Sequence, residues 1–195
     1  MASISPSTFI TITTLLLFFC LSSTSSSAAT TPKTYTNFIK TRCGTTTYPS
    51  LCAKTLLPYA SSVKTNPLNL CTTALNVAIQ GAKSASNSVK KLVSQTGLSK
   101  GDAATIKECI SDLKDVVYEL KDTLDAMARL GDKDREFQWS NAKTRASAAI
   151  TDAETCRDAF SDRKVSASLK KKVAVYVNSV EQLISNALAL INRLY

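Results

Sequence analysis

The amino-acid sequence predicts an all-α protein: an up-down-up-down four-helix bundle with a disulfide-tied N-terminal helical hairpin extension. The composition favours helix, because Ala, Leu, Lys and Ser are common and the 195 residues include only five glycines and five prolines. From residue 66 onward, apolar residues recur every three or four positions in four long runs. We expect the hairpin at about 34–65 and the bundle at about 66–195.

The first segment, residues 1–28, has the layout of a secretory signal peptide. No charged side chain precedes Lys33, and an apolar stretch at 9–21 leads into small polar residues and alanines. This stretch is too short to span a bilayer comfortably. We therefore expect residues 29–195 to be the mature, secreted protein, located in the apoplast or cell wall.

The hairpin is predicted from two short apolar segments flanking a pair of cysteines. Tyr35, Phe38 and Ile39 begin the first helix, and Pro49 begins the second. The intervening "TRCGTTTYPSLC" contains Cys43 and Cys52. A peripheral element with so few apolar residues needs a covalent tie, which would stabilise it by about 2 to 3 kcal/mol in the chain-entropy model.

The bundle is predicted from the four runs, which cover 71–92, 106–127, 139–160 and 169–194. Asn66-Pro67 is an N-cap followed by proline at the first helical position. The linkers at 96–102, 131–134 and 161–168 are short, so consecutive helices must be antiparallel. The fourth run places these residues on the core seam: Leu169, Val173, Tyr176, Val180, Leu183, Ala187, Leu190 and Leu194.

The cysteines can be paired from this topology. Facing residues of an antiparallel helix pair have a constant index sum, which is close to 265 for a turn centred at 132–133. Cys109 and Cys156 meet this condition, and their disulfide would stabilise the fold by about 4 kcal/mol. Cys71 has no facing partner and is predicted to be a buried free thiol. Cys43 then pairs with Cys52, since cleavage removes Cys20.

Several kinds of chemistry are absent from the sequence. There is no histidine, which excludes Ser-His and Cys-His nucleophile systems, and no phosphate-binding glycine loop or dinucleotide motif. Close Cys-x-x-Cys pairs typical of a four-cysteine zinc site are also missing. We expect no metal, no cofactor and no enzymatic activity. Without histidine, any pH dependence near neutrality must come from a partner or from a carboxylate with a raised pKa.

An acidic stripe runs along the second bundle helix of this otherwise basic chain. Its members, spaced by three and four, are Glu108, Asp112, Asp115, Glu119 and Asp122. The stripe has two interpretations: a solvated helix face supported by neighbouring lysines, or a docking surface for a partner. In either case the sequence suggests that these acids lie on exposed helix faces.

Four sequence features together resemble the plant invertase and pectin methylesterase inhibitor family. They are the cysteine hairpin, "IKECISDLKDVVYELKDTLDAM", "ASAAITDAETCRDAF" and "LISNALALINRL". The resemblance covers about residues 34–195 and implies a secreted inhibitor with the same cysteine pairing. It favours inhibition of pectin methylesterase, in a one-to-one complex that blocks the pectin-binding groove. The Pro-Lys-Phe segment of invertase inhibitors is missing.

The resemblance also implies a partner-binding surface on the second and third bundle helices. The corresponding residues are Ser111, Asp115, Tyr118, Asp122, Thr155 and Asp158. Some inhibitors carry acids in place of Ser111 and Tyr118, so these two are departures. With an index sum near 265, Thr155 lies opposite Ile110 and therefore beside Ser111.

Two alternatives to methylesterase inhibition remain open at this point. One is inhibition of a cell-wall or vacuolar acid invertase, and the other is a non-inhibitory bundle that binds wall polysaccharide or a small ligand. The formal charge of +9 suggests weak association with acidic pectin. We expect neither nucleic acid nor a membrane as a partner.

Overall fold

The structure is a computed structural model that describes residues 32–94, 98–162 and 165–195. Within these residues all regular structure is helical. The elements are α1 (Lys33–Cys43), α2 (Pro49–Leu56), the 3-10 turn η2 (Leu57–Tyr59), α3 (Ala60–Val63), α4 (Pro67–Leu92), α5 (Lys100–Ala128), α6 (Arg135–Asp162) and α7 (Ala167–Ile191). The predicted signal peptide, including Cys20, lies outside the described residues.

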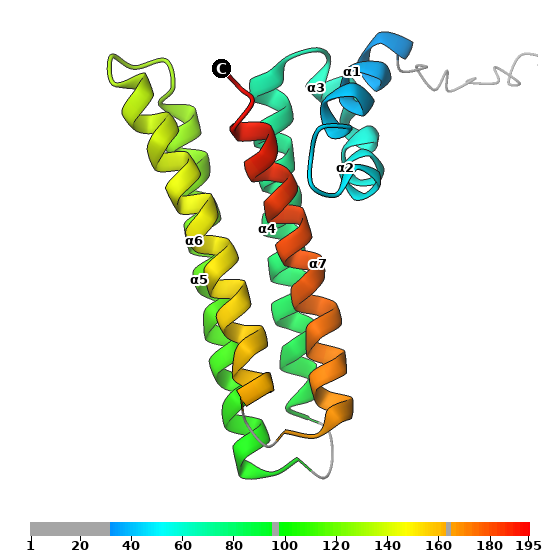
Figure 1. The fold of residues 1–195 in the computed structure, drawn as a ribbon, viewed down its shortest axis with the longest axis vertical. Coiled ribbons are helices and arrows are strands. Elements are labelled where there is room, and N and C mark those ends of the chain that lie inside the picture. Colours follow the sequence, from blue (N-terminus) through cyan, green and yellow to red (C-terminus); the bar gives the residue numbers. More distant parts are fainter. Residues whose placement is uncertain (1–31, 95–97, 163–164) are drawn as a thin grey trace, which may run out of the picture. The chain divides into compact units, whose positions relative to one another are not determined.

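Helices α4 to α7 form the predicted four-helix bundle (Figure 1). Each successive helix runs in the opposite direction, and α5 and α6 lie side by side along their length. Helix α4 also packs against α5 and α7, and α6 packs against α7, so the contacts close into a ring. Short connections between long helices produce this antiparallel arrangement.

Side-chain caps mark where three of the bundle helices begin. The Asn66 side chain accepts hydrogen bonds from the backbone N–H groups of Leu68 and Asn69. Ser99 and Asp102 form a reciprocal capping box at the start of α5. Helix α5 therefore begins at Lys100, inside the segment 96–102 that the sequence assigned to a linker. The capping box satisfies the backbone N–H groups of Ser99 and Asp102.

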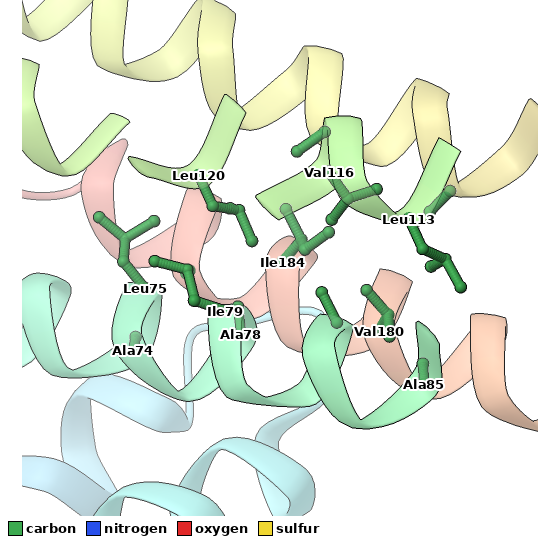
Figure 2. Close-up of a cluster of buried hydrophobic side chains, with 14 of the residues drawn as sticks. Ala74, Leu75, Ala78, Ile79, Ala85, Leu113, Val116, Leu120, Val180 and Ile184 are labelled. Atoms are coloured by element: carbon green, nitrogen blue, oxygen red, sulfur yellow. The ribbon is translucent and has the colours of Figure 1, made fainter. Parts of the chain in front are cut away.

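The core is a continuous set of apolar side chains from all four long helices. Figure 2 shows Leu75 and Ile79 of α4, Leu113, Val116 and Leu120 of α5, and Val180 and Ile184 of α7 pointing into one cluster. Helix α6 contributes small side chains, since Ala142, Ala146, Ala149 and Ala153 are all fully buried. Small residues allow α6 to approach its neighbours closely.

The predicted seam of α7 is partly wrong. Val177, Ile184 and Ile191 are buried, whereas the predicted Tyr176, Leu183 and Leu194 are only half-buried. Each missed residue lies one to three positions from a predicted one, and steps of three and four fit both sets. The amphipathic pattern alone does not decide between adjacent apolar positions. In the same way, Leu124 and Trp139 lie at the edge of the core.

The N-terminal hairpin, α1 to α3, packs against α4 and α7. Cys43 at the end of α1 is bonded to Cys52 in α2, with 5.4 Å between their Cα atoms. A second anchor was not predicted: the side chain of Asn186, only 3% exposed, bonds the backbone of Tyr48. Its Oδ1 accepts from the Tyr48 N–H at 2.9 Å, and its Nδ2 donates to the Tyr48 carbonyl at 3.0 Å.

The remaining cysteines lie inside the bundle. Cys109 of α5 is bonded to Cys156 of α6, with 4.3 Å between Cα atoms, and both are fully buried. Cys71 of α4 is a buried free cysteine. Burial raises the pKa of the Cys71 thiol to about 12, because the thiolate would lose its hydration. Such a thiol is unreactive in the folded protein.

Candidate functional site

The six residues predicted to bind a partner all lie on the outer surface of the α5–α6 pair. Five of them are exposed and one, Asp122, is half-buried. We call this set the α5–α6 face: Ser111, Asp115, Tyr118, Asp122, Thr155 and Asp158. Tyr118 is 59% exposed and is the one large aromatic side chain of this face.

The buried disulfide sets the register behind this face. Cys109 of α5 is bonded to Cys156 of α6. Ser111 follows Cys109 by two residues and Thr155 immediately precedes Cys156, so both lie near the cross-link along the chain. The hydroxyl of Thr155 donates to the backbone carbonyl of Thr151 at 2.9 Å. Its oxygen lone pairs remain oriented for an incoming donor. A rigid pair of helices thus supports the face.

An acidic cluster of Asp112, Asp115 and Asp152 lies where α5 and α6 meet. Partial burial, followed by the nearby charges of Asp115, Asp152 and Glu108, raises the pKa of Asp112 to about 6. Burial also raises the pKa of Asp152, with further contributions from Asp115 and Glu119. The prediction that the helix-two acids all lie on exposed faces is therefore wrong, since Asp112, Glu119 and Asp122 are half-buried against α6.

Further along the same junction, one arginine compensates the acidic charge. Arg145 of α6 bonds both carboxylate oxygens of Glu119, at 3.2 and 3.1 Å. It also lies 3.6 Å from Asp122. Asp122 is consequently engaged within the protein, whereas Asp115 has no ion pair in the part of the chain that the structure describes. Asp115 is the member of the face best placed to offer a carboxylate to a partner.

Asp158 lies toward a different helix junction. Its Oδ1 accepts from Arg157 Nε at 3.3 Å, and Arg157 in turn forms an ion pair with Glu181 of α7 at 2.7 Å. No hydrogen bond or ion pair between described residues links Asp158 or Thr155 to the four α5 members. Ser111, Asp115 and Tyr118 are exposed on α5 and Thr155 is exposed on α6, while the contact with Arg157 links Asp158 to the junction with α7.

Sequence analysis missed two residues of this region, Arg145 and Asp152. A usable signal existed for Arg145, because its index sums with Glu119 and Asp122 are close to the 265 expected for facing positions. Asp152 gave the same signal, because its index sum with Asp112 is also close to 265. The index sum places both residues near α5, but it does not say whether they face outward or toward the junction.

The described residues contain no group of three or more His, Cys, Asp or Glu side chains placed to hold a metal ion. Among the same residues, no helix is both long enough and apolar enough to cross a membrane.

Comparisons with known proteins agree on one family. Residues 37–190 match the family model described as plant invertase/pectin methylesterase inhibitor. The chain is 39% identical over 166 residues to pectinesterase inhibitor 11 of Arabidopsis thaliana, covering 83% of this chain and 82% of that protein. It is 36% identical over 158 residues to a 21 kDa protein of Daucus carota, covering 80% and 82% of the two chains.

A solved structure agrees with the fold. The crystal structure of mutant form A of a pectin methylesterase inhibitor from Arabidopsis superposes with a TM-score of 0.62 at 20% sequence identity. The match covers 80% of this chain and 97% of the other. At this identity the similarity supports the helical architecture and carries no information about individual contact residues.

Proposed function

Because this chain belongs to the plant invertase/pectin methylesterase inhibitor family, we propose that it inhibits pectin methylesterase by covering the enzyme's pectin-binding groove in a one-to-one complex. The matching family model spans most of the chain, and several relatives are named pectinesterase inhibitors. The family consists of enzyme inhibitors, and the chain is not itself an enzyme.

The observation that carries the proposal is the accessibility of the α5–α6 face on a rigid support. Ser111, Asp115 and Tyr118 are exposed and form no hydrogen bond or ion pair with other side chains of the described residues. The Cys109–Cys156 disulfide holds the two helices together directly beneath. A preorganised face loses little conformational entropy on binding, which favours affinity.

The chemistry of the face suits a groove rather than a deep pocket. A broad helical surface can exclude a polysaccharide without entering the catalytic site and without being cleaved. Tyr118 offers an aromatic contact of the kind enriched at protein interfaces. Asp115 offers a carboxylate that can accept charge-assisted hydrogen bonds from basic or polar groups of the enzyme.

A de-esterification assay with a plant pectin methylesterase tests this proposal. Asp115→Lys replaces an acceptor with a cation, and loss of a desolvated charged contact typically costs about 2 to 5 kcal/mol, a thirtyfold or greater weakening. Asp132→Lys, in the exposed turn between α5 and α6, is the matched control with the same charge change and should inhibit as the parent does.

Steric blocking provides a second, independent arm. Thr155→Trp adds bulk at an exposed position of α6 and should prevent the enzyme from approaching the face closely. Asn178→Trp, at an exposed position of α7, should not. If the Asp115→Lys and Thr155→Trp variants both inhibit as strongly as the parent protein, the α5–α6 face is misassigned. Inhibition of acid invertase with no effect on methylesterase would overturn the target while leaving the fold unchanged.

The environment of the protein follows from the same proposal. The apolar stretch near the N-terminus and the two disulfides support secretion into the apoplast, where an oxidising milieu preserves such bonds. The formal charge of +9 supports weak association with acidic pectin there. Mass spectrometry of protein recovered from the cell wall should find a chain that begins near residue 29.

A further inference from the structure

An aromatic and basic pocket lies at the other end of the α5–α6 pair from the disulfide. It has a volume of about 420 Å³, which is within the range of small-ligand sites. The lining residues come from the α5–α6 turn, from the first turns of α6 and from the segment after α7: Lys133, Arg135, Glu136, Trp139 and Tyr195. The established family membership assigns nothing to this pocket.

The two aromatic side chains hold each other in place. The Trp139 and Tyr195 rings pack edge to face, with centroids 5.7 Å apart and planes at 89°. The indole N–H of Trp139 donates to the backbone carbonyl of Ile191 at 2.9 Å, which ties the first turns of α6 to the end of α7. Tyr195 nevertheless remains 61% exposed. A fixed aromatic pair that keeps one ring open to solvent can serve as a stacking platform.

Basic groups surround this platform. The guanidinium carbon of Arg135 lies 5.4 Å from the centre of the Tyr195 ring, and Lys143 Nζ lies 3.7 Å from the centre of the Trp139 ring. These cation–π contacts limit where the cations can go and hold them near the aromatic surface. Lys133 adds a third positive charge at the rim. An arginine held in this way is suited to paired hydrogen bonds with a carboxylate.

Acidic side chains also lie in or beside the pocket. Glu136 is exposed and lines the pocket, where it can accept a hydrogen bond from a sugar hydroxyl. Asp134 is engaged with Gln138, whose Nε2 donates to its Oδ2 at 2.9 Å. No ion pair between described residues engages Lys133, Arg135 or Lys143, so these cations can pair with an anionic ligand.

From these contacts we infer that the pocket formed by Trp139, Tyr195, Arg135 and Lys133 binds an anionic sugar residue, a uronate of the kind that removal of methyl esters from pectin exposes. The C–H face of the sugar would contact the Tyr195 ring, and its carboxylate would pair with Arg135 and Lys133. This inference rests on the proposed function for its choice of ligand. It would hold the inhibitor near the product of its target enzyme.

The pocket contains its own reporter, because Trp139 is the only tryptophan in the sequence. A de-esterified trigalacturonide should change the tryptophan fluorescence of the full protein in a saturable manner. A fully methyl-esterified trigalacturonide and a neutral galactose trisaccharide should bind at least tenfold more weakly. Equal responses to all three would overturn the assignment of an anionic ligand, and no saturable response would overturn the site.

Variants separate the pocket from the general positive charge of the protein. Arg135→Gln and Tyr195→Ala should each weaken trigalacturonide binding about tenfold, with circular dichroism unchanged. Lys171→Gln removes the same charge from an exposed position at the start of α7 and should leave binding as in the parent. If Lys171→Gln weakens binding as much as Arg135→Gln, the association is non-specific and the inference is wrong.

The same variants distinguish this inference from the proposed function. Asp115→Lys should lose methylesterase inhibition and keep the trigalacturonide fluorescence response. Arg135→Gln should keep inhibition measured on a short soluble substrate and lose the response. If the parent protein does not inhibit methylesterase, only the proposed function is contradicted, because uronide binding is measured without the enzyme.

Discussion

The N-terminal hairpin and the α5–α6 pair each contain one disulfide, but the two bonds work in different surroundings. Cys43 and Cys52 are separated by nine positions and join two short helices at the side of the bundle. Cys109 and Cys156 are separated by 47 positions and lie at 0% exposure between two long helices. The hairpin is held by its cross-link, by a polar anchor and by a few buried apolar side chains such as Ile39, Leu56 and Val63, whereas the helix pair is held by a longer apolar interface.

In these two regions, a cross-link and a packed core contribute separately to stability. In the chain-entropy model, the stabilisation by a disulfide grows with the length of the loop that it closes. The Cys109–Cys156 bond therefore adds more to global stability than the Cys43–Cys52 bond does, although the helices that it joins are also the better packed. The Cys43–Cys52 bond closes the shorter loop and therefore adds less, and its effect is expected mainly within the hairpin.

The largest effect on stability is expected from removing the Cys109–Cys156 disulfide. The double variant Cys109→Ala/Cys156→Ala should lower the free energy of unfolding by about 4 kcal/mol. Urea denaturation followed by circular dichroism measures this directly. The bundle should still form, because the seams of α5 and α6 remain apolar. A loss below that of the hairpin variant described next would contradict the loop-length argument.

Removing the Cys43–Cys52 disulfide should lower stability less, and its effect should be confined to the hairpin. Cys43→Ala/Cys52→Ala should lower the free energy of unfolding by about 2 to 3 kcal/mol. Hydrogen exchange should increase in α1 and α2 and change little in α5 and α6. Uniform exchange throughout the chain would mean that the hairpin and bundle unfold as one unit, and would remove the distinction between the two regions.

The polar anchor of the hairpin should matter to a smaller extent. Asn186→Ala leaves the Tyr48 N–H without its partner, whereas the Tyr48 carbonyl keeps its hydrogen bond from the Cys52 N–H, so the cost should be about 1 to 3 kcal/mol. Asn178→Ala, on an exposed part of the same helix, is the control and should change stability little. Chemical denaturation gives the comparison. Equal effects of the two substitutions would show that water replaces the buried contacts without penalty.

The smallest effect concerns pH and the acidic cluster. The pKa of Asp112 is raised to about 6, above the ordinary value of an aspartate, so the folded protein holds an extra proton between about pH 4 and 6. Stability from this group is present at low pH and is lost as pH rises through 6. Because Asp112 is only half-buried and solvent screens its interactions, the change should be about 1 kcal/mol or less.

Asp112→Asn should remove this part of the pH dependence. Thermal unfolding at pH 4.5 and pH 7 should show that the variant gains stability over the parent mainly at pH 7. Asp152, whose pKa is also raised by burial and nearby acids, should retain a weaker dependence in the same direction. A variant that is less stable than the parent at pH 7 would show that the Asp112 carboxylate makes a favourable contact.

Much of the fold was predictable because it depends on local patterns. Repeated steps of three and four residues indicated four helices, and the Asn66-Pro67 pair marked the start of α4. The antiparallel topology then indicated which cysteines face each other. Both disulfides of the structure join the cysteines paired in this way. These features require only the helical period and the lengths of the connections.

The details of the functional surfaces were not predictable in the same way. Asn186 and Tyr48 are 138 residues apart and belong to segments with no shared pattern. Trp139 was expected on the core seam, yet it lies half-buried beside Tyr195 and forms one side of the pocket. The raised pKa of Asp112 depends first on burial and then on nearby acids, one of which, Asp152, belongs to another helix.

The sequence by itself determined the helical class, the number and order of the bundle helices and the pairing of the cysteines. Tertiary structure decided which of two adjacent apolar residues enters the core, as with Tyr176 and Val177 in α7. It also decided which charged groups meet at the α5–α6 junction. The physical reason is that a helix turns by about 100° per residue, so a small rotation during packing exchanges neighbouring side chains between the core and the surface.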